Sequence, residues 1–528
     1  MGLGDGLAAE RVVAAGDQRT MRAMGLLAGL VALGLVLRFW HLGTWGLEGD
    51  EIFTLRDSLA PRLTNPRPLL YLLNYLLVRP TVGLNELGLR LLPALFGVLA
   101  IPTVYFIGRR LVGSRAALFA ALLVALSPIH IYQSQYARYW SLTFLLSAAY
   151  PFAIYYGLRD HSARWLVSGA VLAVLAVLAH PVAILPAGGV IVYYLQGVRR
   201  DDLARIWSKP LLRWIGVALL VVGLILLVRS FSMLQNWIHS HDVKSGPRER
   251  LLDRVPDGLR QLRNLLNYVD NLTLPVTLSA VLGFSALAAG RNRASALLLF
   301  WVALAPVAII TLISFRTPIS TNYFLPAAPA VFLAAGAFLA RLAEVDVGIR
   351  PRWLLPALVT IIVVAGGLPT VISQYRDGRR YDFRGAAQWL KPRMTPGDLV
   401  YSEQYPVMRH YLGQQAQALS FDTTALEGST QRFDRSRQAD ALWIVAPAPS
   451  HAFRVNLRKG GLLTWIYQNC QLRNTLGRAR VDVRQYYLQI YRCPPEASPE
   501  ATPVESGSGI RRDSAGRGSR PLRDSTSR

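Results

Sequence analysis

Charged side chains are scarce in this sequence of 528 residues. Lys, Arg, Asp and Glu make up 17% of it, whereas soluble domains carry about 25%. Hydrophobic residues make up 52%, and apolar runs recur through residues 22–372. Many of these runs approach the roughly 17–25 residues that a helix needs to cross a bilayer. This composition excludes an ordinary soluble protein and predicts a mainly α-helical, polytopic membrane protein.

Cysteine is scarcer still, since the chain has only Cys470 and Cys493. Two cysteines are too few for a metal cluster. We expect both to lie outside the cytoplasm, where disulfides persist, and we predict that they form a bridge. The alternative is a pair of buried free thiols.

Acidic residues are few beside the basic ones, with 32 Asp and Glu against 57 Lys and Arg and a net charge of +25. Such an excess is typical of proteins that bind nucleic acid. Most of the basic residues, however, lie in short loops between apolar runs and in the C-terminal tail. We therefore expect them to orient the chain and to contact anionic membrane lipids, with no nucleic-acid partner.

Eleven membrane spans are predicted from the apolar runs. The first run is too long for a cleavable signal peptide and lacks a small-residue cleavage site, so we expect it to remain as the first span. A His-Pro pair at 180–181 separates the fifth run from the sixth. The spans lie near residues 22–40, 87–108, 115–131, 140–158, 165–179, 181–197, 212–230, 272–290, 294–314, 322–341 and 353–372.

Basic residues of the short loops set the orientation. In an eleven-span arrangement they fall on one side, as Arg109 and Arg110 do, and the positive-inside rule makes that side the cytoplasm. The N-terminus is then cytoplasmic, and the C-terminal region lies outside the cell (inner) membrane. The longer loops 41–86 and 231–271 also lie outside, and residues 68–78 form an amphipathic stretch that we expect along the interface.

The composition changes after residue 372, which predicts four parts. They are a cytoplasmic N-terminal tail at 1–21, a transmembrane domain at 22–372, a small extracytoplasmic α/β domain at 373–495 and a disordered basic tail at 496–528. Within the third part, residues 384–391 favour a helix, and residues 398–401, 441–445 and 486–492 favour strands.

Two adjacent carboxylates, Asp50 and Glu51, follow the first apolar run. Acidic groups held near lipid are costly and usually have a function. Such a carboxylate could deprotonate a hydroxyl or hold a divalent metal ion, and Asp50 is the residue we expect to do either. The alternative is a solvated pair, or partners for Arg56 and Arg62.

Several other polar groups fall on the same predicted face as Asp50. Arg138 follows a polar, aromatic segment and could clamp a phosphate, because a guanidinium forks onto phosphate oxygens. The alternatives are ordinary: Arg138 could snorkel, His180 could be a structural hydrogen-bonding residue, and Arg316 and Tyr323 could anchor a span at the interface. Their convergence on one face favours a functional site there.

These residues carry a resemblance to a known family. The chain resembles bacterial lipid-linked-sugar glycosyltransferases of the GT-C type, the family 39 or protein-mannosyltransferase-like group that includes aminoarabinose transferases of lipid A. The resemblance covers residues 22 to about 415. It rests on Trp45-Gly-Leu-Glu-Gly-Asp50-Glu51, on Asn65-Pro-Arg-Pro-Leu-Leu-Tyr71, on residues 86–102 with Arg109-Arg110, on residues 127–139, and on Ala179-His180 and Tyr323-Phe-Leu-Pro326. It departs from the family at three positions: Tyr136 replaces an acidic residue, Asn65 a histidine and Asn322 an arginine.

The resemblance implies an inverting transfer of a sugar from a polyprenyl-phosphate donor to a lipid, glycan or protein acceptor on the outer face. Asp50 would be the general base, with Glu51 beside it in the catalytic pair, and a divalent metal ion could assist. The departing phosphate needs positive charge. The residues implied for that phosphate are Arg138, Arg316, Lys244 and Arg248, and those implied for the substrates are His180, Tyr139, Tyr323 and Tyr71.

Three other functions fit a polytopic chain. A lipid flippase or transporter would need polar residues near the middle of the membrane, whereas here they lie at one face. A polysaccharide polymerase or ligase with a pyrophosphate-linked donor would need paired arginines in a large outer loop, which residues 231–271 partly supply. A receptor or scaffold would work through residues 373–495, where nothing in the sequence indicates catalysis.

Overall fold

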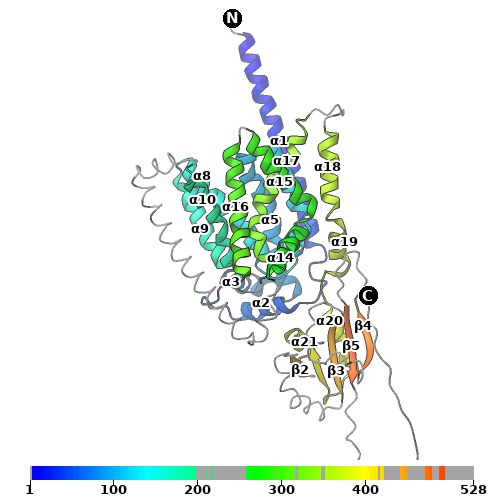
Figure 1. Ribbon diagram of the computed structural model, residues 1–528. Helices are drawn as coiled ribbons and strands as arrows, with labels where there is room; N and C mark the ends of the chain where they lie inside the picture. The colour runs from blue at the N-terminus through cyan, green and yellow to red at the C-terminus, as the bar shows by residue number, and fades with distance from the viewer. Residues whose placement is uncertain are drawn as a thin grey trace, which may run out of the picture.

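The computed structural model describes a helical bundle with a small sheet at one end (Figure 1). The described residues are 3–197, 257–290, 292–315, 319–345, 353–402, 404–413, 417–420, 441–448, 470–477 and 487–493, with a few single residues between them. Lys244, Arg248, Arg316, the predicted span at 212–230 and the predicted tail at 496–528 lie outside them.

Long apolar helices dominate the bundle. In the described part of the chain, five helices are long and apolar enough to cross a membrane, or eight if each bent pair forms one span. The five candidate spans are residues 20–39 of α1 (Leu3–Phe39), α5 (Glu86–Val112), α8 (Trp140–Arg159), α16 (Arg293–Ser314), and η3 (Thr321–Ala327) with α17 (Ala328–Leu342). The predicted count of eleven stays a prediction, since one span lies outside the described residues.

Three pairs of helices are bent at a proline-containing junction. They are α6 (Ser114–Leu126) with α7 (Pro128–Ser134), α14 (Asp257–Leu272) with α15 (Leu274–Ala289), and α18 (Leu354–Ala365) with α19 (Leu368–Asp377), bent by 58°, 92° and 44°. Each second helix has a proline in its first two positions, where the missing N–H is not needed. The shorter apolar helices are α9 (Ala163–Ala179) and η2 (Pro181–Ile184) with α10 (Leu185–Leu195).

The break after α6 is stabilised by the buried Arg38 at the end of α1. Its guanidinium donates to the carbonyls of Val124 and Ala125, at 3.0 and 3.1 Å, and to Nδ1 of His130 at 2.8 Å. A cation at a helix C-terminus satisfies the last carbonyl groups, which have no partner within the helix. Arg38 therefore holds the junction between α6 and α7 in place. The segment that follows α7 leads to the candidate site.

Close packing at the middle of the bundle requires glycine. A Cβ atom on Gly283 of α15 would lie 1.8 Å from the carbonyl oxygen of Ala334 in α17. One on Gly336 of α17 would lie 2.3 Å from the carbonyl oxygen of Ala116 in α6. Small residues at these crossings let backbones approach closely, as is common between helices in membranes.

Short helices cross the end of the bundle that faces the sheet (Figure 1). They are α2 (Gly49–Leu59), α3 (Pro68–Leu73), the π-helical turn η1 (Asn74–Val78) and α4 (Arg79–Thr81). The predicted amphipathic stretch at 68–78 forms α3 and η1, and it exposes Tyr75, Leu76 and Leu77. This arrangement fits a segment that lies along an interface.

The small domain holds a five-stranded sheet in the order β2-β1-β3-β5-β4. Its strands are β1 (Leu399–Ser402), β2 (Gln417–Ser420), β3 (Leu442–Ala448), β4 (Gln471–Leu476) and β5 (Tyr487–Cys493). β1 is parallel to β2 and β3, and β5 is antiparallel to β3 and β4. β1, β3 and β5 confirm the three predicted strands within one or a few residues. β4 was not predicted because its sequence, Gln-Leu-Arg-Asn-Thr-Leu, is polar and mostly exposed.

Two helices, α20 (Phe383–Leu390) and α21 (Tyr405–Leu412), complete the domain, with the short 3₁₀ turn η4 (Lys391–Arg393) after α20. The helix predicted at 384–391 is α20. Cys470 and Cys493, for which we expect a bridge, form a disulfide between the residue before β4 and the last residue of β5. Helix α19 runs across the predicted boundary at residue 372, so the division of the chain there stays a proposal.

The sheet domain and the bundle share a hydrophobic core. Leu47 and Ile52, at the start of α2, pack in one cluster with Phe383, Val407 and Trp443 of the small domain. The Leu47 N–H donates to the Tyr411 hydroxyl at 2.6 Å. Helix α2 is thus held between the bundle and the small domain, and it positions the carboxylates that the sequence singles out.

Candidate functional site

Asp50 lies in the first turn of α2, where its side chain is 55% exposed. Its carboxylate oxygen Oδ2 is 3.8 Å from Nε of Arg138. A second nitrogen of the same guanidinium, Nη1, donates to the Asp50 carbonyl at 3.1 Å and to the Thr54 hydroxyl at 3.4 Å. The structure therefore leaves this carboxylate open to a substrate while a cation lies beside it. Asp50 does not pair with Arg56, which instead pairs with Asp57.

Two guanidinium groups converge on Tyr139, next to Asp50. The Tyr139 hydroxyl accepts hydrogen bonds from Arg138, at 3.0 Å, and from Arg67. The two guanidinium carbons lie 4.7 and 5.0 Å from the centre of the Tyr139 ring. Burial opposes the charge of Arg138, but Tyr139 and Asp50 outweigh it and raise its pKa, so Arg138 stays a cation. This pair of cations can hold an anionic group beside the Asp50 carboxylate.

An aromatic wall continues from Tyr139. The His180 ring centre lies 4.8 Å from those of Tyr139 and Trp140, and 5.5 Å from that of Tyr323. Nδ1 of His180 accepts a hydrogen bond from the Val182 N–H at 3.2 Å, so a neutral ring carries its proton on Nε2. The structure thus brings together three residues, His180, Tyr139 and Tyr323, that the sequence predicts separately.

Tyr71, the fourth predicted substrate residue, lies on α3 and is 2% exposed. Burial raises the pKa of its phenol, and the charges of Arg138 and Arg67 act against this rise. The interaction with both guanidinium groups places Tyr71 at the same cationic site. The Tyr71 side chain is therefore almost fully enclosed by the protein.

Glu51 faces the opposite way from Asp50 and is fully buried. Its two carboxylate oxygens each accept a hydrogen bond of 2.8 Å from Arg90, and Oε2 accepts another from Arg380 at 3.1 Å. The Ala137 N–H donates to Oε1 at 2.8 Å. We call Glu51, Arg90, Arg380 and Ala137 the Glu51 cluster. It joins α2 to α5, to the segment before α8 and to the segment before α20.

The predicted catalytic role of Glu51 does not fit this geometry. Burial opposes its charge, but Arg90 and Arg380 outweigh that effect and lower its pKa to about 2, so the carboxylate stays ionised. A carboxylate that is enclosed and already holds two guanidinium groups cannot reach a hydroxyl of a substrate. Glu51 is instead a positioning residue that holds the first turn of α2.

Glu48 completes the attachment of α2. Its carboxylate accepts a hydrogen bond from the Tyr381 N–H at 3.1 Å, and its own N–H donates to Glu51 at 3.0 Å. Burial raises the pKa of Glu48 to about 7, against the opposing effect of Arg380. The start of α2 therefore carries three different carboxylates. Glu51 is buried and ionised, Glu48 titrates near neutrality, and Asp50 is exposed.

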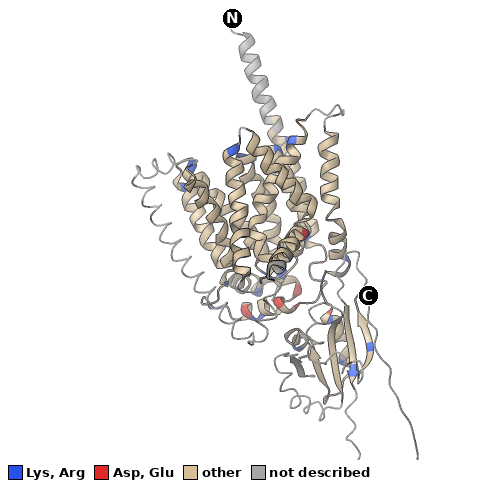
Figure 2. Cartoon of the chain, viewed as in Figure 1, with Lys and Arg blue, Asp and Glu red and all other residues tan. Residues whose placement is uncertain are grey.

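Four site residues were missed by the sequence analysis: Arg67, Arg90, Arg380 and Glu48. A signal existed for three of them. Arg67 and Glu48 lie within the segments 65–71 and 45–51 that carry the family resemblance. Arg90 is a lone charge near the start of the predicted span at 87–108. Nothing local marks Arg380, whose role depends on contacts with residues more than 200 positions away. Figure 2 shows acidic residues on the short helices at this end of the bundle.

A metal ion at Asp50 is not supported by the residues around it. Among the described residues there is no group of three or more His, Cys, Asp or Glu that could hold a metal ion. Glu51, the nearest carboxylate in sequence, is turned into the Glu51 cluster, and the position where the family has an acid is Tyr136. The donor set within the described chain therefore does not fit a protein-bound divalent ion at Asp50.

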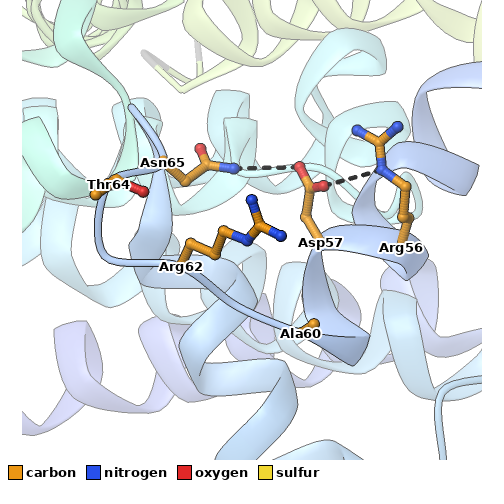
Figure 3. A pocket seen from close by; sticks show the side chains of 6 residues that line it. All are labelled: Arg56, Asp57, Ala60, Arg62, Thr64 and Asn65. Carbon is orange, nitrogen blue, oxygen red and sulfur yellow. Dashed lines mark hydrogen bonds and ion pairs between the residues drawn. The ribbon is translucent and has the colours of Figure 1, made fainter.

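A cavity of about 460 Å³ opens at the far end of α2 (Figure 3). We call it the α2 cavity. Asp57 accepts hydrogen bonds from Arg56 and Asn65, both at 3.2 Å, across its wall. The residues that line it are Arg56, Asp57, Ala60, Arg62, Thr64 and Asn65.

Comparisons with known proteins identify a family model and a fold that this chain resembles. A family model described as dolichyl-phosphate-mannose-protein mannosyltransferase matches residues 68–228. No curated protein sequence matches the chain. The structure of ArnT from Cupriavidus metallidurans bound to undecaprenyl phosphate is 17% identical, with a TM-score of 0.51 over 89% of this chain and 98% of that one. Its apo form gives 17% identity and a TM-score of 0.53 over 91% and 100%.

The oligosaccharyltransferase AglB of Archaeoglobus fulgidus, in complex with an inhibitory peptide and a dolichol-phosphate, is also similar. It is 14% identical, with a TM-score of 0.51 over 86% of this chain and 73% of that one. These identities are low, so the likeness concerns the fold. The chain has the GT-C membrane fold, and the family model and these structures confirm the resemblance to lipid-linked-sugar glycosyltransferases that its motifs indicate.

Proposed function

We propose that this protein is a membrane glycosyltransferase that moves a sugar from a polyprenyl phosphate to a lipid, glycan or protein acceptor. One observation carries the proposal. The exposed Asp50 carboxylate lies beside Arg138, and Arg138 and Arg67 converge on Tyr139. A base next to paired cations is what a transfer needs when a hydroxyl must lose a proton and a phosphate must leave.

The reaction is a single displacement. Asp50 takes the proton of the acceptor hydroxyl as its oxygen attacks the anomeric carbon. The new C–O bond forms on the face opposite the departing phosphate, so the anomeric configuration inverts. The bond between the anomeric carbon and the phosphate oxygen breaks, and its electron pair leaves with the polyprenyl phosphate.

Arg138 and Arg67 would stabilise the negative charge of the departing phosphate. Guanidinium groups fork onto phosphate oxygens, and both are already held in place by the Tyr139 hydroxyl. Arg316, Lys244 and Arg248 stay proposed as further phosphate-binding residues. No metal ion is required in this scheme, and no step is assigned to one.

The aromatic wall would bind the sugar. His180 can donate from Nε2, and the part-exposed ring of Tyr323 supplies an apolar face and a hydroxyl group of the kind that contact sugars. Tyr139 and Tyr71, which are almost fully buried, stay proposed as further substrate-binding residues. Asp50 and this wall lie at one end of the bundle, within reach of a lipid that lies among the helices. The structures of ArnT with undecaprenyl phosphate and of AglB with dolichol-phosphate support a lipid-linked donor.

The orientation is part of the proposal. The loop charges favour a cytoplasmic N-terminus, which places α2 and the small domain at the outer face of the cell (inner) membrane. The Cys470–Cys493 disulfide supports this orientation, because disulfides persist outside the cytoplasm.

The test is transfer of label from a panel of radiolabelled polyprenyl-phosphate sugars by the purified protein in native lipids. Asp50→Asn should reduce transfer by about 10²–10⁴-fold, the usual contribution of a general base, without changing the thermal unfolding midpoint. Asp160→Asn is the matched control, since Asp160 is a part-exposed carboxylate at the other end of the bundle.

Two results would contradict the proposal. Full transfer by Asp50→Asn would remove Asp50 from the chemistry and leave the enzyme class intact. Failure to consume any donor, with labelled lipid crossing the vesicle membrane, would instead favour the flippase.

A further inference from the structure

The α2 cavity is lined by groups that the proposed transfer does not use. Arg56 and Asp57 come from the last turns of α2, and Arg62, Thr64 and Asn65 come from the loop that leads to α3. Its volume of about 460 Å³ is large enough for a monosaccharide unit.

Arg62 is the informative side chain in this cavity. Figure 3 shows it extending into the space between Asp57 and Asn65. Among the described residues, no hydrogen bond or ion pair engages its guanidinium. Asp57, by contrast, already accepts from Arg56 and from Asn65. The cavity therefore presents one cation whose charge is not matched by a carboxylate within the described ranges.

The cavity is aligned with Asp50 along α2. Asp57 follows Asp50 by seven residues, which is close to two turns, so both side chains leave the same face of the helix. The separation along the axis is about 10 Å. Tyr71 links the two places, because its phenol interacts electrostatically with Arg138 and with Asp57.

We propose that the α2 cavity binds an anionic group, carboxylate or phosphate, on a sugar unit of the acceptor. This inference rests on the proposed transfer. Arg62 pairs with the anion, and the Thr64 hydroxyl contacts a neighbouring hydroxyl group. The donor phosphate is assigned to Arg138 and Arg67, whereas Arg62 lies in the cavity at the far end of α2, so we assign the anion at Arg62 to the molecule whose hydroxyl faces Asp50. The acceptor class is thus an acidic glycan or glycolipid.

The experiment measures binding alone. The full-length protein is placed in phosphatidylcholine nanodiscs and titrated with glucuronate, with glucose 6-phosphate and with glucose, by saturation-transfer NMR. We expect saturable binding of at least one of the two acidic sugars and none of glucose. The stronger acidic probe shows which anion the site prefers. Arg62→Gln should weaken acidic-probe binding about 10–100-fold, the usual contribution of a charged hydrogen bond.

Arg164→Gln is the matched control. Arg164 is exposed and lies in the first turn of α9, at the other end of the bundle from the cavity. Its replacement changes the net charge by the same amount. It should leave probe binding unchanged. Asp50→Asn should also retain probe binding, so a failed transfer assay and a failed binding assay are distinguishable.

Four results would overturn the inference. Glucose could bind as well as the acidic sugars, or Arg62→Gln could bind the probes like the wild type. Phosphatidylglycerol in the nanodiscs could displace the probe, which would assign the cavity to a lipid headgroup. Undecaprenyl phosphate could displace it, which would assign the cavity to the donor.

Discussion

The two faces of α2 differ in how far they are open to solvent. One face carries Glu51, enclosed by Arg90 and Arg380 and inaccessible to solvent. The other carries Asp50, more than half exposed and only loosely paired with Arg138. Adjacent residues of the same chemical type thus have opposite tasks, because one step along a helix turns a side chain by about 100°. A saturated buried carboxylate builds the site, and an open one can react.

The comparison also shows that the small domain contributes to the site. Arg380 precedes α20, yet it binds Glu51 and the carbonyl of Gln135. Tyr411 of α21 donates to Glu86 at the start of α5 at 3.0 Å. The orientation of α2 therefore depends on two parts of the chain that are far apart in sequence.

The largest effect is expected from breaking the buried face. Glu51→Gln leaves two buried guanidinium groups without their anion, and such a loss destabilises proteins by about 3–5 kcal/mol. The thermal unfolding midpoint should fall, and transfer should fall with it. Glu344→Gln, at a carboxylate that is 55% exposed, should change neither. An unchanged midpoint in Glu51→Gln would mean that the Glu51 cluster does not hold α2.

A smaller effect is expected from Arg380→Gln, since Glu51 then keeps Arg90. Loss of a charged hydrogen bond costs about 1.5–3 kcal/mol. We expect kcat to fall while the donor KM changes little, because α2 shifts but the cationic site remains. Arg409→Gln, an exposed arginine on α21, is the control. A fall in donor affinity alone would place Arg380 at the substrate instead.

The pH dependence of the buried face separates Glu48 from Glu51. The pKa of Glu48 is about 7 in the folded protein, above its ordinary value of 4.5. The folded state then binds more protons than the unfolded state, so stability falls as pH rises from about 4.5 to about 7. Glu51, with its pKa of about 2, contributes stability that is lost only as pH falls below 4.5.

Thermal unfolding midpoints measured from pH 4.5 to 8 test this expectation. Glu48→Gln should flatten the decline between pH 4.5 and 7, because the amide cannot titrate. A decline that is identical in Glu48→Gln and the wild type would assign the titration to another group.

The smallest effect is expected on the open face. Thr54→Val keeps the shape of the side chain but removes the hydroxyl that accepts from Arg138 at 3.4 Å. A hydrogen bond of this kind contributes about 0.5–1.5 kcal/mol, so transfer should fall about two- to tenfold and the thermal unfolding midpoint should fall only slightly. Thr81→Val, at an exposed threonine of α4, should leave transfer unchanged. A loss of transfer as large as that of Asp50→Asn would mean that Thr54 itself contacts the substrate.

Local patterns allowed much of the fold to be predicted. Continuous apolar runs predict helices that cross lipid, and runs such as 441–445 predict strands, because both depend on neighbouring residues. The spacing of Asp50 and Arg138 from the spans also predicted that both lie at the same end of the bundle, where the structure places them 3.8 Å apart. The distinction between Asp50 and Glu51 could not be predicted, since their partners come from positions 90, 138 and 380.

Tyr136 shows the same limit. From the sequence, Tyr136 indicates only that this chain lacks the acidic residue that the family has at that position. In the structure its ring stacks on Tyr132, with centres 5.3 Å apart, and the Arg380 guanidinium lies 5.6 Å from its centre. The aromatic ring thus packs against the arginine that binds Glu51, a relation that no local pattern contains.

The sequence by itself determined that this chain spans a membrane, that its polar groups gather at one end and that it resembles GT-C glycosyltransferases. These properties follow from hydropathy, charge and motifs, each readable within a few tens of residues. Only the tertiary structure decided which carboxylate is open, which arginines surround the buried one and where, among the described residues, a cation is left unmatched. Those outcomes depend on burial and on hydrogen bonds between distant segments, and such contacts exist only once the chain has folded.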